Sequence, residues 1–442
     1  MRSVRSLPRV LLVCALSAPA AGLGEEPCVV LPSVEGYYQA GTGDGVGVPL
    51  PPASARVEVV VNPQLYASGQ VATDMARYVD DVVRQGYEPI LTVAEFADAA
   101  ALRSHLASGY AAGGLAGAVF VGEMPTAYYE IDEHDDVYGY TWAYDSFPCD
   151  LYFQDLDGAW TDADADGSYD AHAGDVAPEI WLGRLATGRL TGLHPGRTED
   201  GLLNGYFARN HDYRFGRLEV SRDGLAYIDD DWAGPWGDRW SNELALAVTG
   251  SVTQIDHGAT TTAADYKMRL KQAREHVLLC AHSNPTLHRF KIGSTWGGGY
   301  FLNEDLAGTD PNVLFYNLYA CSGARYDTDG FIAGEYVFGT DMGLLAVGST
   351  KTGSMLEFDD YFGPLGEGET FGEAWLNWWT MRAQGGFSES EKDWHYGMTL
   401  LGDPLLVTQE YLPIPEPATL TLLAAGAALL LRRRRSAGPG RG

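Results

Sequence analysis

The chain has 442 residues, of which 45% are hydrophobic and 20% charged, and its formal net charge is −29 at pH 7. This length is enough for one large domain or two subdomains with a sizeable core. The strong negative charge excludes nucleic acid as an expected partner, because phosphate binding needs a basic surface, and it suits a hard cation such as calcium.

The first 21 residues have the pattern of a secretory signal peptide. Arg2, Arg5 and Arg9 flank and precede an apolar stretch at 10–16, and small residues follow at 18–21. A basic region, a short apolar region and a small-residue cleavage site in this order direct export. We therefore expect residues 1–21 to be removed from the mature protein.

Residues 22–55 are rich in Gly, Pro and Val without a clear period, and we expect an irregular lead-in there. Strands and helices then alternate in a first subdomain at 56–216. The expected strands are 57–61, 87–93, 116–121 and 178–182, and the expected helices are 71–85, 97–112 and 202–215. This alternation predicts a parallel α/β sheet with right-handed crossovers.

An acidic stretch interrupts the first subdomain. Its candidate metal ligands are Asp155, Asp157, Asp162, Asp164, Asp166 and Asp170. Within it, the D-x-D-x-D-G loop at 162–167 has the spacing in which alternating carboxylates converge on calcium, and its glycine permits a sharp turn. Ala173 stands where an EF-hand has a bidentate Glu. The sequence thus predicts a structural calcium loop that is not an EF-hand, with a solvated acidic turn as the alternative.

In the second expected subdomain, 217–412, two apolar runs end on reactive side chains. The run H-V-L-L-C-A-H-S leads to His282, and V-L-F-Y-N-L-Y-A-C-S-G leads to Cys321. Both are typical of buried parallel strands, whose carboxyl ends carry the sites of open α/β sheets. A thiol and an imidazole there predict a cysteine nucleophile and its proton-transfer partner. The alternative is that both residues are structural.

Further elements are expected around these two strands. They are strands at 225–228 and 343–348 and helices at 263–275 and 375–381. Four cysteines remain after removal of the leader, and an exported chain can pair them. A Cys28–Cys149 disulfide is one option, whereas a Cys280–Cys321 disulfide would remove the expected nucleophile.

The last segment, 413–442, has three parts. P-E-P at 415–417 precedes an apolar run at 418–431 and four arginines at 432–435. The apolar run is shorter than the ~20 residues of a membrane-spanning helix. This tail resembles the PEP-CTERM sorting signal of Gram-negative bacteria. The resemblance implies a transient membrane-associated segment, cleavage by an exosortase, and delivery to the cell surface or extracellular matrix; a plain C-terminal anchor is the alternative.

Seven motifs match one family in order along the chain. They are V-G-E-M-P at 121–125, C-D-L-Y-F-Q-D-L-D-G at 149–158, G-R-L-A-T at 183–187, the His-bearing strand at 277–282, A-C-S-G at 320–323, A-V-G-S-T at 346–350 and G-D-P-L-L at 402–406. The chain resembles gingipain-type cysteine peptidases of the clan that includes caspases. That resemblance implies an α/β fold, a caspase/gingipain-like parallel-sheet sandwich made of two tandem α/β subdomains.

The same resemblance implies an exported cysteine endopeptidase acting on proteins or peptides. Cys321 would attack the scissile carbonyl, and His282 would protonate the leaving amine. A carboxylate of Asp229 or Asp230 would orient His282.

For substrate binding, the resemblance implies that Asp238 holds a basic P1 residue and that Met355 covers this pocket. Ser283 stands beside the substrate carbonyl where the family usually has Gly. The competing interpretation is a catalytically inactive, calcium-binding surface or matrix protein that retains the fold. A polysaccharide hydrolase is a third reading, but nothing orders the carboxylates into an acid/base pair.

Overall fold

The computed structural model describes the backbone of residues 11–16, 28–31, 55–135 and 140–412, and the side chains of 55–132 and 144–412. Within the expected leader and lead-in it therefore covers only β1 (Leu11–Leu16), β2 (Cys28–Leu31) and Ala55. The expected sorting tail lies outside the described residues. Among the described segments, no helix is both long and apolar enough to cross a membrane.

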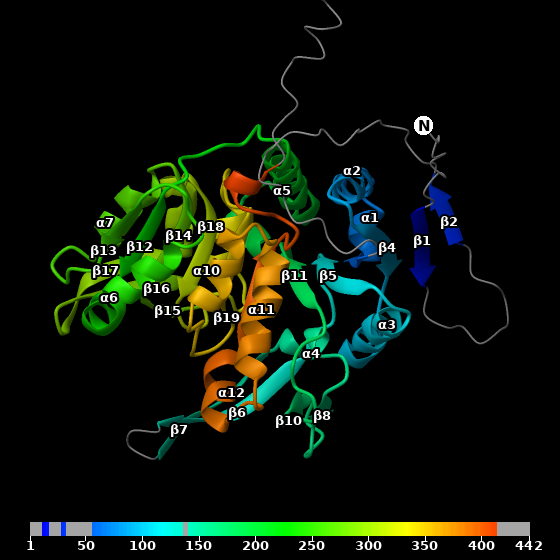
Figure 1. Ribbon diagram of the computed structural model, residues 1–442, viewed down its shortest axis with the longest axis horizontal. Helices are drawn as coiled ribbons and strands as arrows, with labels where there is room; N and C mark the ends of the chain where they lie inside the picture. The colour runs from blue at the N-terminus through cyan, green and yellow to red at the C-terminus, as the bar shows by residue number, and fades with distance from the viewer. Residues whose placement is uncertain (1–10, 17–27, 32–54, 136–139, 413–442) are drawn as a thin grey trace, which may run out of the picture.

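One twelve-stranded sheet runs through the molecule and includes strands from both expected subdomains (Figure 1). The strands lie in the order β13-β12-β14-β18-β19-β20-β11-β5-β3-β4-β1-β2. Beyond β1 and β2 their bounds are β3 (Arg56–Val61), β4 (Glu88–Ala94), β5 (Leu115–Val121), β11 (Trp181–Leu185), β12 (Gly224–Ile228), β13 (Val252–Ile255), β14 (Arg274–Cys280), β18 (Val313–Tyr319), β19 (Leu345–Ser349) and β20 (Met398–Gly402). The α/β class is thus confirmed, and a continuous sheet joins the two halves.

The two halves of the sheet run in opposite directions. Strands β13, β12, β14, β18 and β19 are mutually parallel, as are β20, β11, β5, β3 and β4. The reversal lies between β19 and β20, which pair antiparallel from Leu345 with Gly402 to Ser349 with Met398. The last strand in the chain therefore occupies the middle of the sheet.

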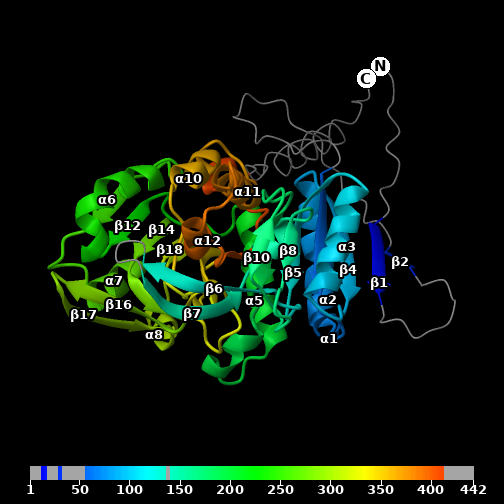
Figure 2. The ribbon, with the colours of Figure 1, turned by 90° about the horizontal axis from the view of Figure 1, so that it is seen from below.

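Helices cover both faces of the sheet (Figures 1 and 2). On β18, for example, Tyr316 packs on Tyr336 of one helix layer, and Tyr319 packs on Trp240 of the other. The helices are α1 (Pro63–Tyr66), α2 (Gln70–Arg84), α3 (Ala99–Ala111), α4 (Leu151–Gln154), α5 (Glu199–Arg214), α6 (Asp230–Leu244), α7 (Ala263–Leu270), α8 (Asn303–Thr309), α9 (Ile332–Phe338), α10 (Asp359–Gly366), α11 (Phe371–Ala383) and α12 (Glu389–His395). Coverage on two faces explains why β14 and β18 are buried at every residue.

Several predicted element boundaries are shifted, among them the end of one strand and the end of one helix. The strand expected to end at residue 182 continues as β11 to Leu185, because Arg184 is neutralised inside the core by two hydrogen bonds to Asp150, at 3.2 and 2.5 Å. The helix expected to reach residue 275 ends as α7 at Leu270. Its last residues instead begin β14, in which Arg274 donates to the carbonyl of Gly224 on β12.

Three small sheets flank the large one. Their strands are β6 (Tyr128–Asp135), β7 (Tyr140–Pro148) and β9 (Ser168–Tyr169) in the first, β8 (Ala159–Thr161) and β10 (Ala171–Ala173) in the second, and β15 (His282–Asn284), β16 (Leu287–Ile292) and β17 (Thr295–Leu302) in the third. The β6–β7 hairpin extends toward the half that carries Cys321 (Figure 2). There Arg325 donates to Asp145 of β7, and Tyr128 of β6 donates to Asp327.

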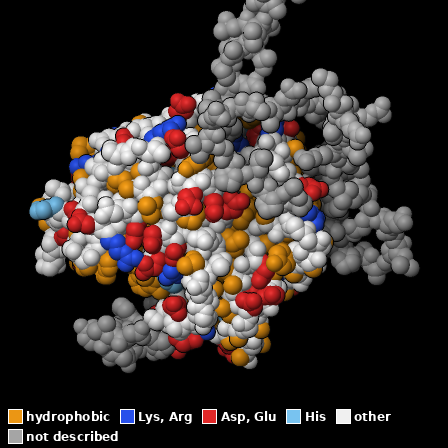
Figure 3. Space-filling model, in the orientation of Figure 1, with side chains coloured by type: hydrophobic (Ala, Val, Ile, Leu, Met, Phe, Trp, Pro, Cys, Tyr) orange, Lys and Arg blue, Asp and Glu red, His pale blue; other side chains and the backbone are white. Residues whose placement is uncertain are grey.

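Acidic side chains form several separate patches on the face shown in Figure 3. This distribution accords with the 59 Asp and Glu residues of the chain against 30 Lys and Arg.

Candidate active site

The strand register brings His282 and Cys321 to the same edge of the sheet. Cys280 of β14 pairs with Tyr319 of the parallel strand β18, and the amide of Ala281 donates to the carbonyl of Tyr319 at 3.1 Å. His282 and Cys321 each follow two residues later. The two reactive residues therefore follow the ends of adjacent strands.

The loops that follow these strands touch one another. A Cβ on Gly323 would lie 3.5 Å from Oγ of Ser283, which is ordinary van der Waals contact. The hydroxyl of Ser283 donates to the carbonyl of Leu287 at 2.8 Å. Ser283 thus belongs to the β15–β16 hairpin and packs beside the turn after Cys321.

Cys321 differs from the other described cysteines in its exposure. Cys149 and Cys280 are buried, whereas Cys321 is partly exposed, and each of the three is a thiol. The Cys280–Cys321 and Cys28–Cys149 disulfides considered above are therefore not formed. Burial raises the pKa of the Cys280 thiol, as does the negative charge of Asp229, so Cys280 is a poor source of thiolate at neutral pH.

The turn after Cys321 has a strained backbone. Ser322 has φ of 55°, in the left-handed region that residues other than glycine rarely adopt. Its amide donates to the carbonyl of Lys351 at 2.7 Å, and the amide of Ala324 donates to the carbonyl of Ser349 at 2.9 Å. The end of β19 thus holds the turn that presents the thiol. Such strain is found most often at functional sites.

The carboxylate that contacts His282 belongs to Asp231. Nε2 of His282 donates to Oδ2 of Asp231 at 2.6 Å, and Nζ of Lys291 donates to the same oxygen at 2.5 Å. Partial burial raises the pKa of Asp231, but the hydrogen bonds and positive charges of Lys291 and His282 outweigh it and lower the pKa overall. Trp232 and Trp296 pack on the imidazole, with ring centroids 4.7 and 4.8 Å away. Together they fix the orientation of the ring.

Asp229 and Asp230, which were expected to orient His282, have other partners. Asp229 is fully buried before α6, and its Oδ2 accepts the amide of Lys291 at 2.9 Å. Burial raises the pKa of Asp229. Asp230 packs against Gly258 in the loop after β13. Asp229 anchors the hairpin strand β16, so it supports the site indirectly.

The two residues expected to form a basic P1 pocket, Asp238 and Met355, have other partners. Asp238 is exposed on α6, and its Oδ1 accepts a hydrogen bond from Gln254 at 2.9 Å. Met355 is fully buried, and its sulfur accepts a hydrogen bond from Asn317 at 3.1 Å. Tyr319, two residues before Cys321, packs against Trp232 and Trp240. Aromatic rings therefore pack at the end of the strand that leads to Cys321.

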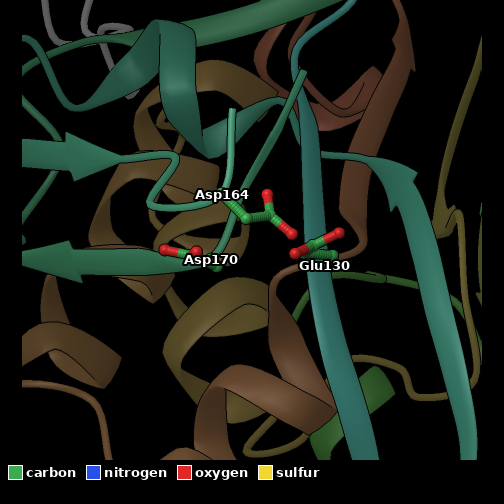
Figure 4. A group of neighbouring side chains, drawn as sticks. All are labelled: Glu130, Asp164 and Asp170. Carbon is green, nitrogen blue, oxygen red and sulfur yellow. The ribbon is translucent and has the colours of Figure 1, made fainter. Parts of the chain in front are cut away.

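The six candidate metal ligands separate into different groups. Asp162, Asp164 and Asp166 bring ligand oxygens within 4.8 Å of one another, and so do Asp164, Asp170 and Glu130. Figure 4 shows the carboxylate of Asp164 turned toward Glu130, which lies on β6, with Asp170 beside them. Asp164 belongs to both groups. The loop and β6 can thus supply five carboxylates to one region.

Asp155 and Asp157 form a separate group with Glu179. Asp155 is fully buried and bonded to Nε2 of His172, while its Oδ1 accepts the amide of Gly158 at 2.6 Å. Burial raises the pKa of Glu179 to about 7. Asp155 therefore acts as a buried structural carboxylate and does not join the 162–170 loop.

Sequence reasoning missed six residues of these sites. Four lie around His282, namely Asp231, Trp232, Lys291 and Trp296, and the other two are Glu130 beside the acidic loop and Glu179 beside Asp155. Asp231 belongs to a run of three aspartates, so the sequence indicates an acidic group near His282 but not which of the three contacts it. Nothing in the sequence links Glu130 to a loop more than thirty residues away.

No protein-family model matches the chain, and no curated protein sequence matches it. Its fold is similar to that of solved structures. The crystal structure of the Arg-specific cysteine proteinase gingipain R (RgpB) matches with a TM-score of 0.54 and 14% identity over 80% of this chain and 78% of that one. The complex of Porphyromonas gingivalis RgpB pro- and mature domains matches with a TM-score of 0.53 and 15% identity, covering 79% of each chain. These comparisons confirm a gingipain/caspase-like fold.

Proposed function

We propose that the chain is a cysteine endopeptidase with Cys321 as nucleophile and His282 as its proton-transfer partner. One observation carries this proposal: a partly exposed thiol and an imidazole each follow the end of one of two adjacent parallel strands, two residues beyond a pair that is in register. The similarity in fold to cysteine proteinases supports the same class of chemistry.

The geometry assigns a role to each group in peptide hydrolysis. The thiolate of Cys321 attacks the scissile carbonyl carbon, and the C–N bond breaks when His282 gives a proton to the leaving amine. The remaining thioester is then hydrolysed by water, which returns the thiol and releases the new carboxyl group. Because Nε2 of His282 is bonded to Asp231, Nδ1 is the nitrogen that exchanges this proton. The amide of Cys321 is our candidate donor to the oxyanion.

A thiol-directed irreversible peptidyl inhibitor tests this proposal. We expect it to modify Cys321, located by mass spectrometry, and to leave Cys149 and Cys280 unmodified as internal controls, since both are buried. Cys321→Ala should lose all peptidase activity, and His282→Ala should lose most of it. Activity that survives in purified Cys321→Ala would refute the nucleophile assignment.

The competing function is an inactive surface or matrix protein with the same fold. The hydroxyl of Ser283, where the family usually has Gly, is the observation that favours it. Failure of the inhibitor to modify Cys321 in folded wild-type protein would support this alternative. Specificity for a basic P1 residue rested on Asp238 and Met355, and the contacts of these two residues lend it no support.

We also propose structural calcium at the 162–170 loop together with Glu130. Its support is the D-x-D-x-D-G spacing and the convergence of five carboxylates on one region. A hydrogen bond from Tyr144 lowers the pKa of Glu130, but burial and the negative charges of Asp166, Asp164 and Asp170 together outweigh it and raise the pKa overall. A divalent cation would relieve this repulsion.

Export to the cell surface or matrix of a Gram-negative bacterium, with release of the tail by an exosortase, completes the proposal. It rests on the sequence patterns at 1–21 and 413–442.

A further inference from the structure

An arginine lies directly across from His282 in the β15–β16 hairpin. His282 of β15 is the register partner of Arg289 of β16 in this antiparallel pair. Directly opposed residues of an antiparallel pair point to the same face, with Cβ atoms ~5 Å apart. The side chain of Arg289 therefore starts beside the imidazole that we assign to catalysis.

Aromatic rings hold the guanidinium of Arg289. Its Cζ lies 4.0 Å from the ring centroid of Trp296 and 5.3 Å from that of Tyr300. These two rings, on β17, are 45% and 53% exposed. Trp296 also contacts His282. The rings thus position a partly exposed cation at the rim of the site, on the strand next to His282.

Arg289 makes no ion pair and no hydrogen bond with any residue that the structure describes, and its Nε is buried without a partner. Neighbouring cations are different: Lys291 pairs with Asp231, Arg269 with Asp265, and Arg239 with Glu243. Although the chain has 59 acidic and 30 basic residues, the guanidinium of Arg289 has no carboxylate partner among the described residues. Its planar donors fit a carboxylate in bidentate geometry.

The charges around the dyad disfavour a basic substrate residue. Arg289 and Lys291 both lie next to Trp296. The nearest carboxylate, that of Asp231, already accepts hydrogen bonds from His282 and Lys291. Charges more than ~8 Å away are largely screened at physiological salt, so the acidic surface elsewhere does not reverse this local field.

We propose that Arg289, held by Trp296 and Tyr300, binds the carboxylate of an acidic side chain that flanks the scissile bond. The inference rests on the proposed peptidase function and names its substrate class: peptides with Glu or Asp next to the cleaved bond. A carboxylate at the end of a peptide chain has the same chemistry, and the experiment separates the two sources.

The cleavage test uses pairs of amidated peptides that differ only by Glu or Gln, placed in turn on either side of one cleavage site. We expect wild-type protein to cleave the preferred Glu peptide about tenfold faster in kcat/KM than its Gln partner. Arg289→Gln should bring this ratio close to one. Arg289→Lys should retain part of the preference, since Lys cannot bind in bidentate fashion. Arg269→Gln, on α7, is the matched control and should keep the ratio.

A binding test separates this inference from the proposed function. Fluorescence anisotropy of labelled peptides is measured on Cys321→Ala and on Cys321→Ala with Arg289→Gln. Tighter binding of the Glu peptide that disappears with Arg289→Gln supports the subsite even if no peptide is cleaved by wild-type protein. Equal binding of the Glu and Gln peptides overturns the subsite. A preference that requires a free terminal carboxylate, and not an internal Glu, also overturns it.

Discussion

Asp231→Asn tests how the site orients its imidazole. The change removes the charge that accepts hydrogen bonds from His282 and Lys291, at 2.6 and 2.5 Å, but keeps the shape of the side chain. A charge-assisted hydrogen bond contributes ~1.5 to 3 kcal/mol when well shielded. Here the side chains of Asp231 and His282 are 37% and 32% exposed, and Asn can still accept one bond. We therefore expect a loss of about 1 to 2 kcal/mol in transition-state stabilisation, which is about 5- to 30-fold in kcat/KM.

Two assays check this expectation. One is kcat/KM on a cleaved peptide, and the other is the rate at which iodoacetamide alkylates Cys321, which reports on the thiol whether or not a substrate is known. Both should fall in Asp231→Asn. The matched control is Asp238→Asn, the same change further along α6 at a residue whose partner is Gln254, and it should match wild type. If Asp231→Asn stays within about twofold of wild type in both assays, the orienting role is refuted.

Three further predictions concern stability and processing. Burial raises the pKa of Glu275 to about 7 from an ordinary 4.5, so the folded protein loses stability as pH rises between these values; Glu275→Gln should recover up to about 3 kcal/mol near pH 8 and little near pH 5, as measured by denaturant unfolding. Calcium should raise the melting temperature of wild type but not of Asp164→Asn, whereas Asp157→Asn, in the separate group, should respond as wild type does; a calcium response in Asp164→Asn equal to that of wild type would refute the loop assignment. Mass spectrometry of protein from the surface of the producing cell should find residues 418–442 missing, and an intact C-terminus would instead identify a permanent anchor.

The elements that carry the dyad could be predicted from the sequence. The runs that became β14 and β18 are short, apolar and rich in aliphatic or aromatic residues, and each ends at a residue able to do chemistry. Because they are covered on both faces, their composition alone identifies them as central strands. Their pairing places the residues that precede His282 and Cys321 side by side at one edge of the sheet, and the roles of the two side chains stay a prediction.

The exact partner of His282 could not be predicted in the same way. Three aspartates stand in a row at the start of α6, and each residue of a helix is rotated by ~100° from the last. Only the rotation of the helix against the sheet decides that Asp231 faces His282 while Asp229 is buried. The sequence does not predict the register of the β15–β16 hairpin either, so Arg289 was not recognised as the neighbour of His282.

The position of β20 also affects how the chain must fold as it is made. This strand lies between β19 and β11, yet residues 398–402 are synthesised after every other described strand of the sheet. Until they emerge, both half-sheets have an open edge, and open edges invite pairing with other chains. Chains that end before residue 398 should therefore aggregate even though they contain Cys321 and His282. The sheet that carries the thiol is thus complete only after β20 has entered it. Any activity therefore depends on the synthesis and insertion of this strand.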